Sequence, residues 1–179
     1  MSGARLSPGP ENIADDRRQG INVRRVISDK QMTVQKCRVQ GVFMAVSEMG
    51  AAPTVLLDIG GESMVPIYIG LWEAISISNA LNSEVLPRPI THDLIIEVFR
   101  NFEIALDALH IDALDGGVFY AKLMLRQGSR TEMMDCRPSD GIAIALRYPA
   151  PIMIEDTVIE AAAVKKADLP QLVDLKEYL

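Results

Sequence analysis

The sequence has 179 residues, of which 49% are hydrophobic and 23% are charged, as is typical of one soluble globular domain with a sizeable core. Its longest apolar runs fall well short of the roughly 20 residues that a membrane-spanning helix needs, which argues against an integral membrane protein. No hydrophobic segment follows residues 1–5, so we expect no signal peptide and predict a cytoplasmic protein. Cys37 and Cys136 do not have metal-ligand spacing and are predicted to be buried free thiols.

The net charge of −6 is spread unevenly along the chain. Residues 1–40 have a balance of +4, so the remaining residues carry −10. Such an acidic body disfavours a protein that coats nucleic acid through many phosphate contacts. It leaves open an enzyme that binds phosphodiesters through metal ions held by carboxylates.

Residues 1–34 contain prolines, glycines and paired charges without a sustained apolar period, which predicts a mobile N-terminal extension. Met32, just before the first strand pattern, is an alternative natural start. The predicted folded domain, residues 35–162, opens with strand patterns at 36–48, 53–59 and 64–69. In the second of these, Val55, Leu57 and Ile59 share one face.

Two helices are predicted next. The first spans residues 71–82 and is almost uncharged, so we expect it to be buried, with Trp72 in the core or in an interface. Two prolines make residues 86–90 extended. Thr91 is then predicted to cap a helix that ends near residue 102 and lies on the outside, because it has one apolar and one polar face.

Three further strands are predicted at residues 106–113, 118–126 and 130–136, with glycines in the turns between them. Pro138 suits the first turn of a helix. Every residue from 142 to 146 is apolar, which predicts a helix covered on more than one side. A short strand at 151–154 and a helix from Thr157 to about residue 167 follow, and residues 163–179 are predicted to form a C-terminal helical tail.

The two uncharged helices begin alike. Residues 73–78 and 140–145 correspond at a separation of 67 residues, each segment opens with an acid, and each follows three strands. This pattern indicates a duplicated β-β-β-α unit. We therefore predict an α+β fold in which two such units form a three-layer β/α/β arrangement with buried helices.

Five phrases, in order and at similar spacing between about residues 39 and 162, together resemble the bifunctional nuclease domain family. They are Pro66-Ile67-Tyr68-Ile69-Gly70 with Glu73-Ala74, Arg88-Pro89-Ile90-Thr91-His92-Asp93-Leu94, Phe119-Tyr120-Ala121, Arg137-Pro138-Ser139-Asp140 with Ile142-Ala143, and Ala150-Pro151-Ile152. The resemblance implies two β-β-β-α repeats in three layers, a homo-oligomer, and nuclease activity on RNA and DNA.

A metal-dependent nuclease needs carboxylates or an imidazole to hold a hard cation, a base or metal to activate water, and a cation to bind phosphate. Mg²⁺ or Mn²⁺ is the cofactor that this hypothesis requires. The candidates are Glu73, Asp93 and Asp140 for the metal, His92, Asp93 and Asp140 for catalysis, Arg88 and Arg137 for the phosphate, and Asp135 as a further acid.

Each candidate also has a structural interpretation. Asp93 and Asp140 occupy first turns, where carboxylates stabilise helices regardless of function. His92 can simply hydrogen-bond within its loop, and Arg137 can pair with Asp140 or Asp93 as an internal strut. His110 is predicted on the outward face of a strand. The alternative to a nuclease is therefore a non-catalytic oligomeric scaffold or regulatory module.

Overall fold

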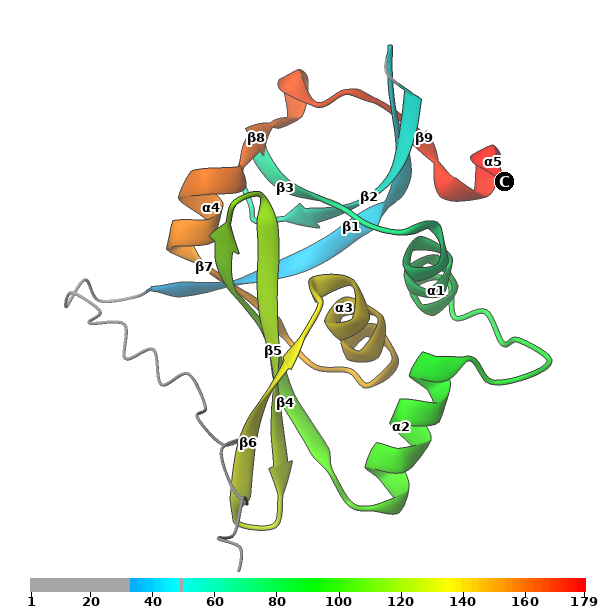
Figure 1. The fold of residues 1–179 in the computed structure, drawn as a ribbon, viewed down its shortest axis with the longest axis vertical. Coiled ribbons are helices and arrows are strands. Elements are labelled where there is room, and N and C mark those ends of the chain that lie inside the picture. Colours follow the sequence, from blue (N-terminus) through cyan, green and yellow to red (C-terminus); the bar gives the residue numbers. More distant parts are fainter. Residues whose placement is uncertain (1–32, 49) are drawn as a thin grey trace, which may run out of the picture. The chain divides into compact units, whose positions relative to one another are not determined.

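The computed structural model describes residues 33–48 and 50–179. Its first three strands, β1 (Val34–Ser47), β2 (Gly50–Asp58) and β3 (Ser63–Tyr68), pair antiparallel in chain order (Figure 1). Val55 of β2 pairs with Val42 of β1 and with Ile67 of β3, and all three side chains are buried. The three predicted strands are therefore confirmed. The prediction for the N-terminal extension and for Met32 falls almost entirely outside the described residues.

A second antiparallel set contains β4 (Ala105–Asp115), β5 (Val118–Gln127) and β6 (Arg130–Cys136), as predicted. Gly116 and Gly117 connect β4 to β5 with φ angles of 56° and 82°, which favour glycine. β7 (Ile152–Glu155) pairs parallel with β4 and antiparallel with β1, and so joins the two sets. The resulting sheet has nine strands and is mostly antiparallel, with the order β6-β5-β4-β7-β1-β2-β3-β8 and β9 beside β1.

The helices are α1 (Leu71–Leu81), α2 (Thr91–Asn101), α3 (Pro138–Arg147), α4 (Asp156–Ala162) and α5 (Leu175–Tyr178). Seven of the ten residues of α3 are buried, which confirms the helix predicted from its apolar sequence. Gly141 faces Leu109 of β4, and a Cβ at this position would overlap with the leucine side chain. The glycine therefore lets α3 approach the sheet closely, while α1 and α2 both contact α3 (Figure 1).

Three local predictions are wrong. Thr91 is the first residue of α2 and Ile90 is the cap, because the N–H of Ile90 binds the side chain of Asp93, at 2.9 Å. The helix predicted to reach residue 167 ends at Ala162. The helix at 71–82 is not buried all round, because α1 is buried on one face only. Trp72, on its open side, is 79% exposed and lies outside the core, while its alternative placement in an interface stays a prediction.

The C-terminal segment, residues 163–179, is not a helical tail. It contains β8 (Val164–Lys165), a 3-10 helix (Lys166–Asp168) and β9 (Gln171–Asp174) before the single turn of α5. β8 pairs with β3, and β9 pairs with β1. The segment is extended because the edges of two existing strands offer it backbone hydrogen bonds, which outweigh its local helical pattern.

The described structure is thus a mixed α/β fold with a large, mostly antiparallel sheet. One run of three antiparallel strands precedes α1 and another precedes α3, with α2 between them. Of these two helices α3 is buried, whereas α1 is buried on one face only. Among the described residues, no helix has both the length and the apolar character that crossing a membrane requires.

Candidate functional site

A pocket of about 960 Å³ opens where α1, α2 and α3 meet strands β5 and β6. Most of its wall is apolar, and includes Ile75, Ile95, Val98, Phe99, Leu123 and Ile144. Polar side chains also line it, and they are Glu73, Ser76, Asn79, Thr91, His92, Asp135, Arg137 and Asp140. The pocket therefore combines a large apolar surface with a cluster of ionisable groups.

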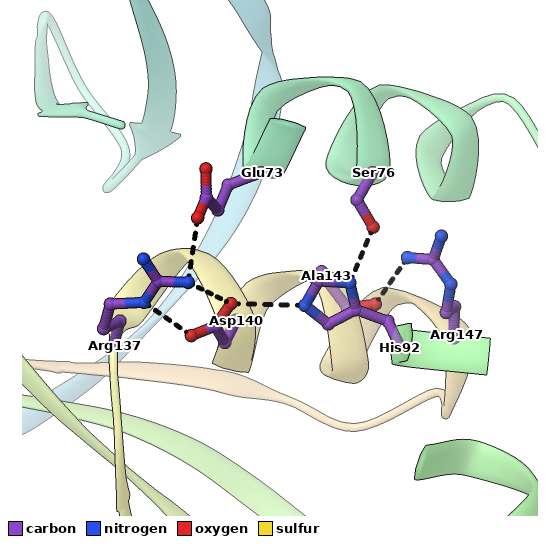
Figure 2. A network of polar contacts seen from close by, with 7 residues as sticks. All are labelled: Glu73, Ser76, His92, Arg137, Asp140, Ala143 and Arg147. Carbon is purple, nitrogen blue, oxygen red and sulfur yellow. Dashed lines mark hydrogen bonds and ion pairs between the residues drawn. The ribbon is translucent and has the colours of Figure 1, made fainter. Parts of the chain in front are cut away.

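Arg137 connects Glu73 at the start of α1 with Asp140 at the start of α3 (Figure 2). It lies between β6 and α3 in an extended conformation, so its side chain reaches Asp140 in the first turn of the helix. Its Nε donates to Oδ2 of Asp140 at 2.7 Å and its Nη2 to Oδ1 at 3.0 Å. The same Nη2 lies 2.8 Å from Oε1 of Glu73 on α1. One guanidinium thus holds together the two acids that lie at the starts of α1 and α3, 67 residues apart in the sequence.

The Asp140 carboxyl is held in its ionised form. Burial raises its pKa, but the hydrogen bonds and positive charge of Arg137 outweigh burial, and the pKa lies below its ordinary value. The neighbouring thiol behaves oppositely, because burial raises the pKa of Cys136 to about 11. Cys136 is therefore a neutral thiol in the pocket wall, free as predicted but only partly buried, whereas Asp140 is an anion.

His92, near the start of α2, connects α1 to α3 (Figure 2). Its Nε2 lies 3.3 Å from Oδ1 of Asp140, and its Nδ1 lies 2.9 Å from Oγ of Ser76. Because ionised Asp140 can only accept a hydrogen bond, Nε2 carries a hydrogen. In the neutral ring Nδ1 is then an acceptor for the Ser76 hydroxyl. The site is thus a chain from Ser76 through His92 to Asp140 and Arg137.

Replacing Asp140 with asparagine is expected to flatten the loss of stability in acid. A carboxyl whose pKa is lower in the folded state stabilises the fold above its ordinary pKa of about 4, and this contribution disappears as the pH falls through the lowered value. Chemical unfolding of both proteins between about pH 2 and pH 7 measures the difference. Glu97→Gln, an exposed carboxylate of α2, is the control and should keep the wild-type slope. Identical slopes in wild type and Asp140→Asn would contradict the assignment.

The structure brings together four of the predicted site residues, Glu73, His92, Arg137 and Asp140, and places exposed Asp135 at the same pocket. The other two lie elsewhere. Asp93 binds Arg147 at 2.6 Å, in a smaller pocket formed with other residues of α1, α2 and α3. Arg88 is exposed in the loop before α2 and makes no hydrogen bond or ion pair within the described part of the chain.

Comparison with known proteins identifies the family of the chain. Residues 54–167 match the bifunctional nuclease domain, which is more than half of the chain. The chain belongs to the bifunctional nuclease domain family. It is also 36% identical over 125 residues to an uncharacterized protein of Mycobacterium tuberculosis, covering 69% of this chain and 74% of that protein.

More distant relatives of this family member come from rice. Bifunctional nuclease 2 of Oryza sativa subsp. japonica is 22% identical over 173 residues, which cover 94% of this chain and 50% of the rice protein. Bifunctional nuclease 1 of Oryza sativa subsp. indica is 27% identical over 101 residues, or 55% of this chain and 30% of the rice protein. The matches therefore span half or less of these plant relatives.

The metal predicted for this family member has no ready site in the described structure. The three predicted ligands are divided, because Asp93 faces Arg147 while the guanidinium of Arg137 bridges Glu73 and Asp140. Among residues 33–48 and 50–179, no group of three or more histidine, cysteine or acidic side chains is arranged to hold a metal ion. The carboxylates as they stand do not fit Mg²⁺ or Mn²⁺, and the cofactor stays a prediction.

Two residues of this bifunctional nuclease domain, Ser76 and Arg147, were not among the candidates predicted from the sequence. Ser76 follows Glu73 by three positions and so shares its face of α1. Arg147 follows Asp140 by seven positions on α3, which makes it a neighbour of the same side of the helix. These spacings were visible in the sequence. What identifies the two residues is their partners on α2, His92 and Asp93.

Proposed function

We propose that this protein is a nuclease that hydrolyses phosphodiester bonds of RNA or DNA at the Arg137–Asp140–His92 cluster. The family and the names of the rice relatives support the choice of substrate. The single observation that carries the proposal is the ionised Asp140, which binds an imidazole on one side and an exposed guanidinium on the other, at the wall of a large pocket.

Arg137 supplies the phosphate contact. Its side chain is 65% exposed, and its Nη1 makes no hydrogen bond or ion pair among the described residues, so this nitrogen can donate to a non-bridging phosphate oxygen. Asp140 and Glu73 hold the other nitrogens in place. The group is therefore positioned before the substrate arrives, and it lies where negative charge increases during attack at phosphorus.

His92 acts as the general base through Ser76. The attacking water passes a proton to Oγ of Ser76 as the Ser76 hydroxyl hydrogen moves to Nδ1 of His92. The imidazolium that forms keeps its Nε2 hydrogen on Asp140, and the negative charge of Asp140 stabilises it. The water oxygen bonds to phosphorus, the opposite ester bond breaks, and the leaving oxygen takes a proton from solvent.

The remaining predictions belong to this proposal. We infer a homo-oligomer on the strength of the family resemblance, and a cytoplasmic location from the sequence. Mg²⁺ or Mn²⁺ stays the predicted cofactor, although the described carboxylates as they stand do not fit it. We also infer that β1–β3 with α1 and β4–β6 with α3 are duplicated units in a three-layer arrangement. The equivalent positions of Glu73 and Asp140 in the sequence, and their contacts with one guanidinium, support the duplication.

One observation favours the alternative, a non-catalytic scaffold or regulatory module. Three carboxylates, Glu73, Asp135 and Asp140, line the same pocket as one arginine, and two of them already neutralise that arginine. A polar cluster of this kind can have a purely structural role, in which it holds three helices together. Measured cleavage must therefore decide between the two functions.

The test is cleavage of single-stranded RNA and DNA in Mg²⁺, in Mn²⁺ and in EDTA, by wild type, His92→Ala and Asp140→Asn. Loss of a general base lowers the rate by about 100- to 10,000-fold, and we expect at least a 100-fold loss in both variants. The metal and EDTA arms test the predicted cofactor at the same time.

The matched control uses the second of the two histidines. His110 lies on the face of β4 opposite Leu109, with Nε2 3.1 Å from Oε1 of the buried Glu155, and is less exposed than predicted. His110→Gln should cleave as wild type does once folding is verified by circular dichroism. Cleavage that survives in folded His92→Ala and Asp140→Asn, or no cleavage by wild type, would refute the proposed function.

A further inference from the structure

Phosphodiester hydrolysis uses only the polar part of the pocket and leaves its apolar part unexplained. That part is lined by side chains from five elements, among them Ile75 of α1, Phe99 of α2 and Leu123 of β5. A monomeric protein rarely leaves so large an apolar surface open unless something binds there.

One face of α1 supplies the features of a binding surface for a flat, partly polar group. Trp72, Ile75, Ser76 and Asn79 follow one another at helical spacing and all line the pocket. Trp72 is 79% exposed, so its ring is available for stacking. The side-chain amide of Asn79 makes no hydrogen bond within the described residues, so both its donor and its acceptor are available.

The charges at the pocket limit how a nucleic acid can be held there. Three carboxylates line it with a single arginine, and the chain beyond residue 40 is strongly acidic. A continuous track of cations along a sugar-phosphate backbone is therefore absent from the described lining. Any tight contact must come from a base and from at most one or two phosphates.

Building on the proposed nuclease function, we propose that the apolar part of this pocket holds one unstacked base of a single-stranded nucleic acid. Trp72 stacks on the base, the Asn79 amide hydrogen-bonds to its edge, and Arg137 contacts the adjoining phosphate. A base that is paired and stacked in a duplex cannot enter the pocket, so the site selects single strands.

The sole tryptophan of the chain makes the proposal directly measurable. Binding of a single-stranded oligonucleotide should quench the fluorescence of Trp72, whereas a hairpin duplex of the same sequence should not. Titrations in EDTA prevent metal-dependent cleavage during the measurement. Because about one phosphate is contacted, the slope of log K against log salt should be only about −0.7, rather than the steep slope of a protein that binds many phosphates.

The variants separate stacking from general effects on the surface. Trp72→Ala should weaken binding of a labelled single strand by about 10- to 100-fold, as measured by fluorescence anisotropy. Phe102→Ala removes another exposed aromatic ring, one that does not line the pocket, and should bind as wild type does.

Equal quenching by the duplex, unchanged affinity in Trp72→Ala, or a salt slope steeper than about −3 would overturn the proposal. Its failure is distinct from failure of the nuclease function. Binding with these properties but without cleavage supports the base site and refutes the nuclease. Cleavage that does not change in Trp72→Ala, with no quenching, refutes the base site alone.

Discussion

Ile142→Ala is expected to lower the free energy of unfolding by about 2–5 kcal/mol, which is the cost of removing a large aliphatic side chain from a packed core. Ile142 is completely buried in α3, the helix that α1, α2 and the sheet all contact. The loss combines transfer of the removed carbons with the cavity left behind, because neighbouring helices cannot close fully around it. Chemical unfolding monitored by circular dichroism measures this difference.

The control for that experiment is Leu94→Ala on α2. Leu94 is 60% exposed, so the same kind of truncation should change the free energy of unfolding by no more than about 0.5 kcal/mol. If Ile142→Ala were as mild as Leu94→Ala, then α3 would not be the packed centre of the domain. The prediction that the apolar helix is buried would then have to be abandoned.

Asp93→Ala is expected to cost about 2–3 kcal/mol of stability, because it removes two interactions at once. Asp93 accepts a hydrogen bond from the backbone N–H of Ile90 and binds the guanidinium of Arg147, at 2.9 Å and 2.6 Å. Arg147 is only 11% exposed, so its charge would lose its partner in a place where water can hardly replace it.

The carboxyl of Asp93 reflects the same contacts. Burial raises its pKa, but the hydrogen bonds from Arg147 and from the Ile90 N–H lower it by a larger amount. The pKa of Asp93 therefore lies below its ordinary value. Asp93→Ala/Arg147→Met should therefore regain part of the lost stability, because the charge left without a partner is removed. Glu97→Ala breaks an exposed pair with Arg100 on the same helix and should change stability by less than about 0.5 kcal/mol.

Asp93→Ala also separates the two interpretations of this residue. If Asp93 only stabilises the start of α2, folded Asp93→Ala should cleave nucleic acid at the wild-type rate per molecule at a temperature well below its unfolding midpoint. A loss as large as that expected for Asp140→Asn would show instead that Asp93 takes part in the reaction. The structural interpretation would then be wrong.

The sequence contained enough information to locate most of the elements. Seven strands and the helices at 71–81, 91–101 and 138–147 lie close to where alternation, helical spacing and turn residues predict them. These signals are local. Alternating side chains along a strand, or a continuous apolar run along a helix, indicate how that same element is buried. Gly70 and Pro138 indicated the starts of α1 and α3 for the same local reason.

The predictions failed where a specific hydrogen-bonding partner decides the outcome. Residues 171–174 become strand β9 because β1 offers a free edge, although their own pattern favours a helix. Ile90 replaces Thr91 as the cap because the Asp93 side chain reaches its N–H. In both cases a hydrogen-bonding partner, and not the intrinsic preference of the residue, selects the conformation.

Seven strands, the buried helix that begins at Pro138 and the family of the chain could all be predicted from the amino-acid sequence. The candidate acids Glu73, Asp93 and Asp140 could not be told apart in this way, because each lies in the first turn of a helix. Only the tertiary structure decided that Asp140 meets His92 and Arg137, whereas Asp93 meets Arg147 and Arg88 lies apart. The physical reason is that a carboxylate in a first turn is stabilised by its own helix in either case, while its chemical role depends on which neighbouring helix faces it.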